Sequence, residues 1–219
     1  MSTAKDLFII AMDPRSQDRV GQGDLSLALA GAELIDLIGA RAVTVDGDRI
    51  VPGEPPAEAP ADASVPDDAL LGEAASALVR EKPFERIEDW LWRRGRDLSA
   101  AYRKASEAEG QLRRRRGGRL PFGPEQLEVV DTPARRRAED RKDRGEPVLA
   151  ELASAVGVDG ARSASEEGGG AEPGAGADLG GEAVTTVLAV VHDAVMELEA
   201  VRRRRNIENT AFANIWRVP

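Results

Sequence analysis

Five arginines stand close together in the middle of this chain and are the residues best suited to meet an anion. They are Arg113, Arg114, Arg115, Arg116 and Arg119. Apolar Leu120 and Phe122 follow them directly, next to glycines and prolines that are typical of a turn. The segment therefore joins positive charge to side chains that can leave water, within a chain whose formal net charge is −9.

The charge of the chain is unevenly distributed. Residues 90–144 carry 16 Lys and Arg against 9 Asp and Glu, a balance of +7, whereas the rest carry 14 against 30, a balance of −16. A basic segment in an acidic chain favours a polyanionic partner. The alternative is that these arginines pair with carboxylates elsewhere in the fold.

No constellation of catalytic or metal-binding residues is apparent. The chain has no cysteine and one histidine, His192, beside which Asp193 points in another direction if both lie on a helix. Neither a phosphate-binding P-loop nor a G-x-S-x-G motif occurs. We therefore expect no enzyme activity, no cofactor and no metal site. The apolar run at 7–12 is too short for a signal peptide, so we expect a soluble, cytoplasmic protein.

The hydrophobic pattern predicts a mainly α fold, a single helical domain over residues 3–216 with two small β-hairpins. Asp46-Gly47 marks the turn of the first hairpin, and Leu127 to Val130 indicate a strand of the second, with the arginines at its turn. Asp24 is a plausible N-cap and Pro83 suits the first turn of a helix. The predicted helices cover residues 3–12, 26–40, 67–80, 83–94, 97–112, 132–145, 147–158 and 182–209.

Four further expectations concern the order and the burial of particular segments. Two segments, a Pro-rich acidic one at 51–66 and a Gly-rich acidic one at 159–181, are predicted to lack stable structure. The helix at 132–145 is so charged that it should be a solvated helix or an arm. The helix beginning at residue 182 should be the most buried element, since residues 184–198 are apolar on nearly every side. The tail at 211–219 should fold back on the body.

The order of these features resembles the Golgi phosphoprotein 3 family in its bacterial form. The resemblance rests on LAGAELIDLIGARAVTVDGDRI, on DDALLGEAASALVREKPFERIEDWLW after a proline-rich gap, and on the helix that precedes RLPFGPEQLEVVDT. It implies a peripheral membrane protein that binds phosphatidylinositol 4-phosphate. It also implies an adaptor for membrane enzymes, and the hairpin in this family touches the bilayer or a neighbouring subunit.

The resemblance also implies where a lipid head group would bind. The family's pocket uses a tryptophan and an arginine around the second helix, positions that fall near Gly21 and at Ala30 here. It also uses two basic residues three apart on the helix before the second hairpin. Arg103 or Lys104 takes the first position, while the second falls among residues 105–107. The expected membrane-contact residues of the hairpin are Leu120 and Phe122.

These arguments predict a protein that lies on anionic or phosphoinositide membranes through Arg103, Lys104 and the five hairpin arginines. Partners would be anionic phospholipid head groups, a membrane-protein client and a second copy of the chain. Nucleic-acid binding is the alternative from another class, because helix–helix–hairpin units resemble winged helices and an Arg-rich wing can follow phosphates. An adaptor without an anionic ligand is the third interpretation.

Overall fold

The computed structural model describes residues 2–14, 16, 20–53, 68–116, 125–158 and 181–215. Eight helices account for 65% of these residues and two antiparallel two-stranded sheets complete the fold, so the mainly α prediction is confirmed. In chain order the elements are α1 (Thr3–Ala11), α2 (Gln22–Gly39), β1 (Val43–Asp46), β2 (Arg49–Pro52), α3 (Ala69–Ser76), α4 (Ile87–Arg94), α5 (Leu98–Ala108), β3 (Leu112–Arg116), β4 (Glu125–Val129), α6 (Pro133–Asp143), α7 (Pro147–Ala155) and α8 (Glu182–Ile215).

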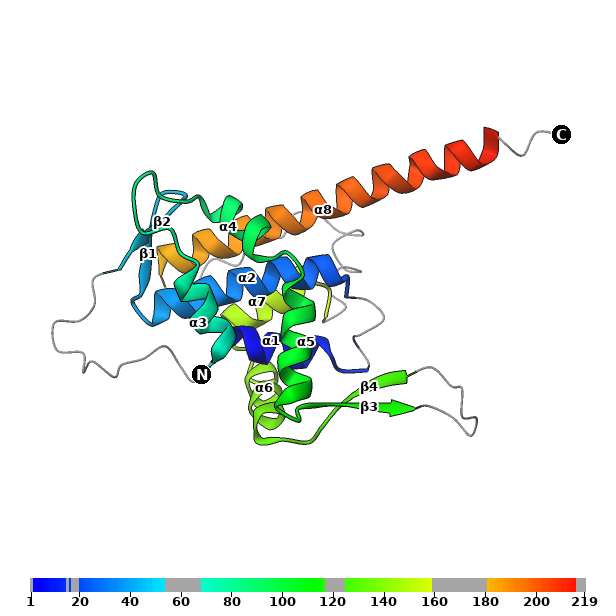
Figure 1. Cartoon of the computed structure of the whole chain (residues 1–219), viewed down its shortest axis with the longest axis horizontal. Helices are drawn as coiled ribbons and strands as arrows, with labels where there is room; N and C mark the ends of the chain where they lie inside the picture. Colours follow the sequence, from blue (N-terminus) through cyan, green and yellow to red (C-terminus); the bar gives the residue numbers. More distant parts are fainter. Residues whose placement is uncertain are drawn as a thin grey trace.

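Helix α2 is the centre of the molecule, and α1, α3, α4, α5, α7 and α8 all pack on it (Figure 1). Its sequence is mostly apolar, and all of its residues from Asp24 to Ile35 are buried. Gly31 lets α8 approach closely, because a Cβ there would stand 2.3 Å from a methyl group of Val191. Among the described residues, α2 therefore has the largest number of buried residues of any helix.

Helix α8 was predicted to be the most buried element, and this prediction is wrong. One face of its first half enters the core through Val184, Val187, Val191, Ala194 and Val195. Met196 on the other face is exposed, and Leu188 and Leu198 are only partly buried. The tail does not fold back as far as residue 215, because α8 runs straight on to Ile215 and leaves the body behind (Figure 1).

Two helix starts differ from the sequence prediction. Helix α2 begins after Gly21, and the predicted cap Asp24 lies inside its first turn, where its carboxylate accepts hydrogen bonds from Arg202 at 2.7 and 2.8 Å. Helix α4 begins at Ile87, so Pro83 precedes it rather than standing in its first turn. Thr132 does cap α6 as its type predicts, since its hydroxyl accepts from the backbone N–H of Arg135 at 3.2 Å.

The first hairpin is formed as predicted. Strands β1 and β2 pair with Asp46 opposite Arg49, and Gly47 has a φ of +60°, which favours glycine in a tight turn. Residues 51 and 52 of the segment predicted to lack structure belong to β2. The rest of that prediction, residues 54–66 and 159–180, lies outside the described residues.

Helix α6 is neither an arm nor a purely solvated helix. It packs on α1 with Ala138 buried between the two. Arg137 and Arg141 reach the fully buried carboxylate of Asp6, at 2.9 and 2.7 Å. The charged face therefore turns partly inward, where it stabilises the contact between the first helix and the sixth.

Candidate functional site

The second hairpin is anchored at its base and extends away from the body (Figure 1). Leu112 of β3 and Val129 of β4 are paired and buried, and they belong to the hydrophobic core. Helix α5 leads directly into β3 and packs against it. The hairpin thus has a fixed root, so the remaining residues of β3 and β4 are held out from the helical body.

Four of the five arginines lie in strand β3 rather than at the turn, where the sequence analysis had placed them. Each faces a residue of β4: Arg113 pairs with Glu128, Arg114 with Leu127, Arg115 with Gln126 and Arg116 with Glu125. Because side chains alternate along a strand, Arg113 and Arg114 point to opposite faces of the hairpin. Positive charge is thereby offered on both faces.

Acidic neighbours accompany the first two arginines, as the alternative interpretation of the charge run foresaw. Arg113 contacts Glu128 at 3.4 Å, and Arg114 contacts Glu107 of α5 at 3.1 Å. The side chains of Arg113 and Arg114 remain 69% and 62% exposed. Exposed ion pairs contribute about 0–1 kcal/mol, so an external anion can compete for these guanidinium groups at little cost.

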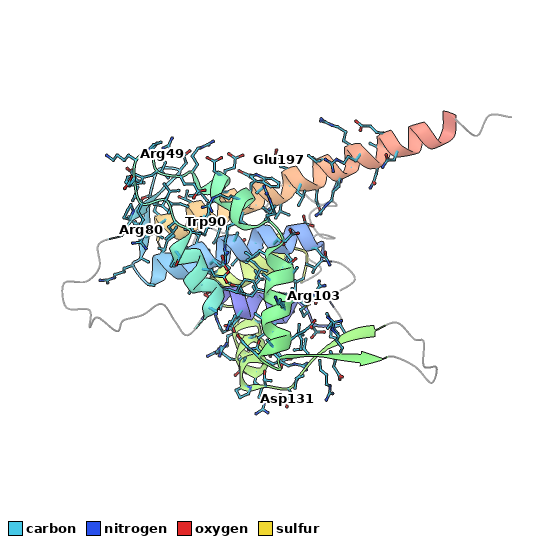
Figure 2. All side chains as sticks on the ribbon, in the orientation of Figure 1. Arg49, Arg80, Trp90, Arg103, Asp131 and Glu197 are labelled. Carbon is cyan, nitrogen blue, oxygen red and sulfur yellow. The ribbon has the colours of Figure 1, made fainter. Side chains whose placement is uncertain are left out.

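Helix α5 presents one arginine in a different environment. Arg103 is half-buried, its Nε is fully buried, and this nitrogen has no hydrogen-bond partner among the described residues. A buried donor without an acceptor costs about 1–3 kcal/mol, so such a group is exceptional in a folded protein. Figure 2 labels Arg103 on α5, the helix that runs into the hairpin. Its neighbour Lys104 is exposed, so of the two candidates only Arg103 is constrained by its surroundings.

Three predicted site residues lie outside the described part of the chain. They are Arg119, Leu120 and Phe122, between β3 and β4. The structure gives the strand positions of Arg115 and Arg116 and no more. The membrane-contact role of Leu120 and Phe122 therefore stays a prediction.

The other positions that the resemblance maps to a lipid pocket have structural roles here. Ala30 is fully buried, and its carbonyl oxygen accepts the indole N–H of Trp90 at 3.2 Å. Gly21 caps α2 beside the ion pair of Asp24 and Arg202, which would crowd any side chain at that position. On α5, Ser106 is buried. Within the described part of the chain, Arg103 is thus the residue of this mapped set whose unused hydrogen-bond donor is buried.

Sequence reasoning missed a buried polar cluster between α2, α4 and α5. Arg94 donates two hydrogen bonds to the carboxylate of Glu33, at 2.8 and 3.0 Å, and the hydroxyl of Tyr102 donates to the same carboxylate at 3.1 Å. Burial raises the pKa of Glu33, although Arg94 and Tyr102 oppose that effect. Burial, reinforced by the nearby carboxylate of Glu33, also raises the pKa of Tyr102. A glutamate within an apolar helix was the available signal.

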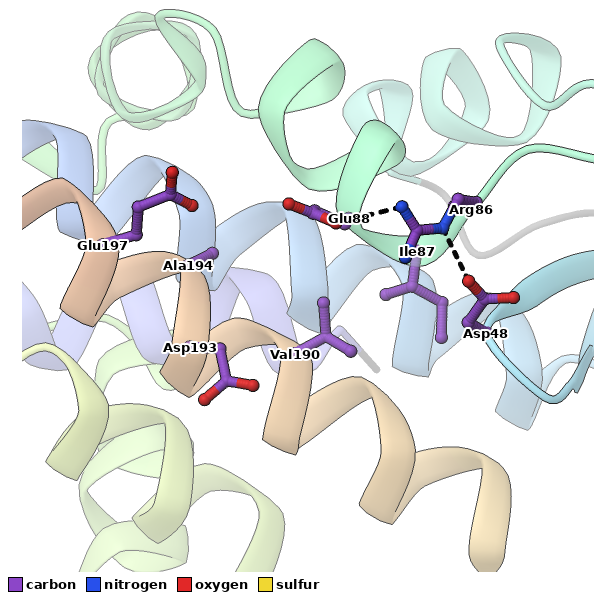
Figure 3. Close-up of a pocket in the computed structure, with 8 residues that line it drawn as sticks. All are labelled: Asp48, Arg86, Ile87, Glu88, Val190, Asp193, Ala194 and Glu197. Atoms are coloured by element: carbon purple, nitrogen blue, oxygen red, sulfur yellow. Dashed lines mark hydrogen bonds and ion pairs between the residues drawn. The ribbon is translucent and has the colours of Figure 1, made fainter.

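A pocket of about 240 Å³ opens on the other side of the molecule, between α4, α8 and the first hairpin (Figure 3). Asp48, Glu88, Asp193 and Glu197 supply carboxylates, and Ile87, Val190 and Ala194 supply apolar walls. Arg86 pairs with Asp48 at 2.6 Å and with Glu88 at 3.3 Å, and its hydrogen bond lowers the pKa of Asp48. Within the described ranges no group of three or more His, Cys, Asp or Glu is arranged to hold a metal ion.

A family model described as Golgi phosphoprotein 3 (GPP34) matches residues 4–198, which is nearly the whole chain. None of the curated proteins matches the chain. Among the described residues, no helix is long and apolar enough to cross a membrane.

Proposed function

Since this chain belongs to the Golgi phosphoprotein 3 family, we propose that it binds peripherally to anionic membranes through Arg103 and the β3–β4 hairpin. The ligand is a phosphorylated lipid head group, with phosphatidylinositol 4-phosphate as the first candidate. Two features support the proposal: a half-buried arginine with an unused donor on α5, and two largely exposed arginines, Arg113 and Arg114, in the strand that follows this helix.

The unpartnered Nε of Arg103 is the observation on which the proposal chiefly depends. A guanidinium group that is partly removed from water and lacks an acceptor gains most from a ligand that brings several. A phosphate group does so, and it also supplies the opposite charge. Lys104 is exposed on the same helix, so it gives up more hydration on binding, and it has no fixed geometry with which to select a ligand.

The hairpin supplies the nonspecific part of the affinity. Each basic side chain near an anionic bilayer contributes about 1 kcal/mol, and the four arginines of β3 together with Arg119 add to one another. Apolar insertion of Leu120 and Phe122 is the second signal that stable anchoring requires, because a single weak signal gives only reversible binding. A role as an adaptor for a membrane-protein client remains a prediction from the family.

Vesicle binding with matched charge variants tests the proposal. The protein is sedimented with vesicles of phosphatidylcholine, with or without phosphatidylserine or phosphatidylinositol 4-phosphate. Changing Arg113→Gln and Arg114→Gln together should weaken binding to both anionic vesicles by about 30-fold, the loss of two side chains at about 1 kcal/mol each. Changing Arg80→Gln and Arg96→Gln removes the same charge from exposed positions outside the hairpin and should leave binding within about threefold.

Head-group recognition is tested separately at α5. Arg103→Gln should weaken binding to phosphatidylinositol 4-phosphate vesicles more than binding to phosphatidylserine vesicles, whereas Lys104→Gln should weaken both equally. If the two variants lost the same affinity for each kind of vesicle, Arg103 would contribute only general positive charge and no head-group recognition. A wild-type protein that ignores acidic lipid but binds duplex DNA with a steep salt dependence would replace the membrane proposal by nucleic-acid binding.

A further inference from the structure

The last third of α8 projects from the body and is not explained by family membership. The family match ends at residue 198, whereas α8 continues to Ile215. The ion pair between Arg202 and Asp24 is the outermost link from α8 to the body that the described residues show, and all residues from 203 to 209 are exposed. Most helical stability in proteins comes from tertiary packing, so a partner on the projecting part would stabilise it.

The outer face of α8 carries a stripe that faces away from the body. Its members follow one another at intervals of three or four residues, which places them on one side of a helix. Met196 and Ile207 in this stripe are 50% and 70% exposed, large apolar side chains in open water. The stripe consists of Ala189, His192, Met196, Ala200, Arg203 and Ile207, all of them exposed.

Opposite charges stand on the two sides of Ala200. Towards the body, Asp193 and Glu197 line the acidic pocket together with Glu88 and Asp48 (Figure 3). Neither Asp193 nor Glu197 forms an ion pair with any residue that the structure describes. Towards the free end, Arg203 makes one contact of 3.7 Å with Glu199, a turn earlier, and Arg204 makes none with the described residues. The face is therefore acidic at one end and basic at the other.

We propose that this face binds a second copy of the chain, with the two α8 helices antiparallel and crossing at Ala200. In such a pair a residue before Ala200 lies opposite the residue equally far after it. Glu197 then meets the partner's Arg203, and the partner's Arg204 lies between Asp193 and Glu197 at the mouth of the acidic pocket. Because a two-fold interface is self-complementary, each contact occurs twice.

Charge and shape select this arrangement over the alternatives. A parallel pair would stack the two arginine clusters on each other and the two acidic ends on each other, which is unfavourable. Ala200 is small and exposed, so the helix axes can approach closely at the crossing. From Ala189 to Ile207 the paired faces extend for about 27 Å. The bodies do not collide, because each is attached to the side of α8 that faces away from the stripe.

Charge reversal with rescue tests the dimer directly. The measurement is sedimentation equilibrium of the full chain at low ionic strength, up to about 100 µM, a range that detects affinities well below those of stable interfaces. Wild type should be dimeric. Asp193→Arg with Glu197→Arg should be monomeric, as should Arg203→Glu with Arg204→Glu. An equimolar mixture of the two variants should form heterodimers, since each then offers the charge that the other lacks.

A matched variant and the salt dependence complete the test. Arg205→Glu changes the same charge two residues from Arg203, on the opposite side of the helix, and should stay dimeric. Salt at about 1 M should weaken the wild-type dimer by shortening the Debye length to about 3 Å. A monomeric wild type, variants that remain dimeric, or a mixture that remains monomeric would each overturn the proposal.

Discussion

Two groups of arginines in this chain look alike in sequence and differ in the structure. Arg94 and Arg141 have side chains only 14% and 19% exposed, and they reach the fully buried carboxylates of Glu33 and Asp6 at 2.8 and 2.7 Å. The hairpin arginines Arg113 and Arg114 are largely exposed and pair at longer distances.

The comparison shows that the carboxylate, rather than the arginine, decides which role an arginine takes. Glu33 and Asp6 stand on helices that face the core, so each needs a cation to compensate its burial and draws an arginine inward. Glu107 and Glu128 are partly solvated and impose no such demand. Arginines next to solvated carboxylates stay available to an external anion.

Removing the carboxylate of a buried pair should have the largest effect. Glu33→Ala leaves Arg94 without its partner in a desolvated position and Tyr102 without its acceptor, and it should lower the free energy of unfolding by about 3–5 kcal/mol. Urea unfolding followed by circular dichroism measures this. Glu81→Ala, at an exposed position, should change the same free energy by less than about 0.5 kcal/mol. A small loss for Glu33→Ala would make the two arginine groups equivalent.

The same pair should give stability a dependence on pH. Because burial raises the pKa of Glu33 above 4.5, the folded chain holds this proton more tightly than the unfolded chain. Its contribution is thus largest below pH 4.5 and declines as the pH rises through the folded pKa. Glu33→Gln should flatten this decline without abolishing it, since burial also raises the pKa of Asp36. A decline equally steep in wild type and variant would contradict the assignment.

A hairpin arginine should have the smallest effect on folding. Arg114→Ala breaks only an exposed contact with Glu107, so the free energy of unfolding should change by less than about 1 kcal/mol. Thermal unfolding of the variant beside Arg94→Ala gives the contrast directly. A loss for Arg114→Ala that approaches the loss for Arg94→Ala would show that the hairpin arginines stabilise the fold.

The helices and the first hairpin could be predicted from the sequence because the residues that determine them are close together along the chain. Asp46-Gly47 determines its own turn and Thr132 caps its own helix, so neither needs information from elsewhere in the chain. Ile87, Trp90 and Leu91 of α4 likewise follow a helical spacing, and all three are buried.

Distant partners account for what the sequence could not predict. Asp24 resembles a helix N-cap in sequence, but its carboxylate instead accepts a hydrogen bond from Arg202, 178 residues later. The charge of α6 looks solvated until the buried Asp6 is known to face it. For the site, the basic strand could be located from composition. The unpartnered nitrogen of Arg103 depends on the side chains that pack around α5, and the hydrophobic periodicity of the sequence does not predict those contacts.

The hairpin and α8 lie on opposite sides of the helical body (Figure 1). A copy attached to a bilayer by its hairpin therefore holds the α8 stripe on its far side, facing solution. Two copies joined at Ala200 would turn their hairpins away from each other, so they cannot both rest on one flat sheet of lipid. Such a particle is two-headed: it would crosslink separate vesicles, and a suspension of anionic liposomes should become turbid with wild-type protein and stay clear with either charge-reversed variant alone.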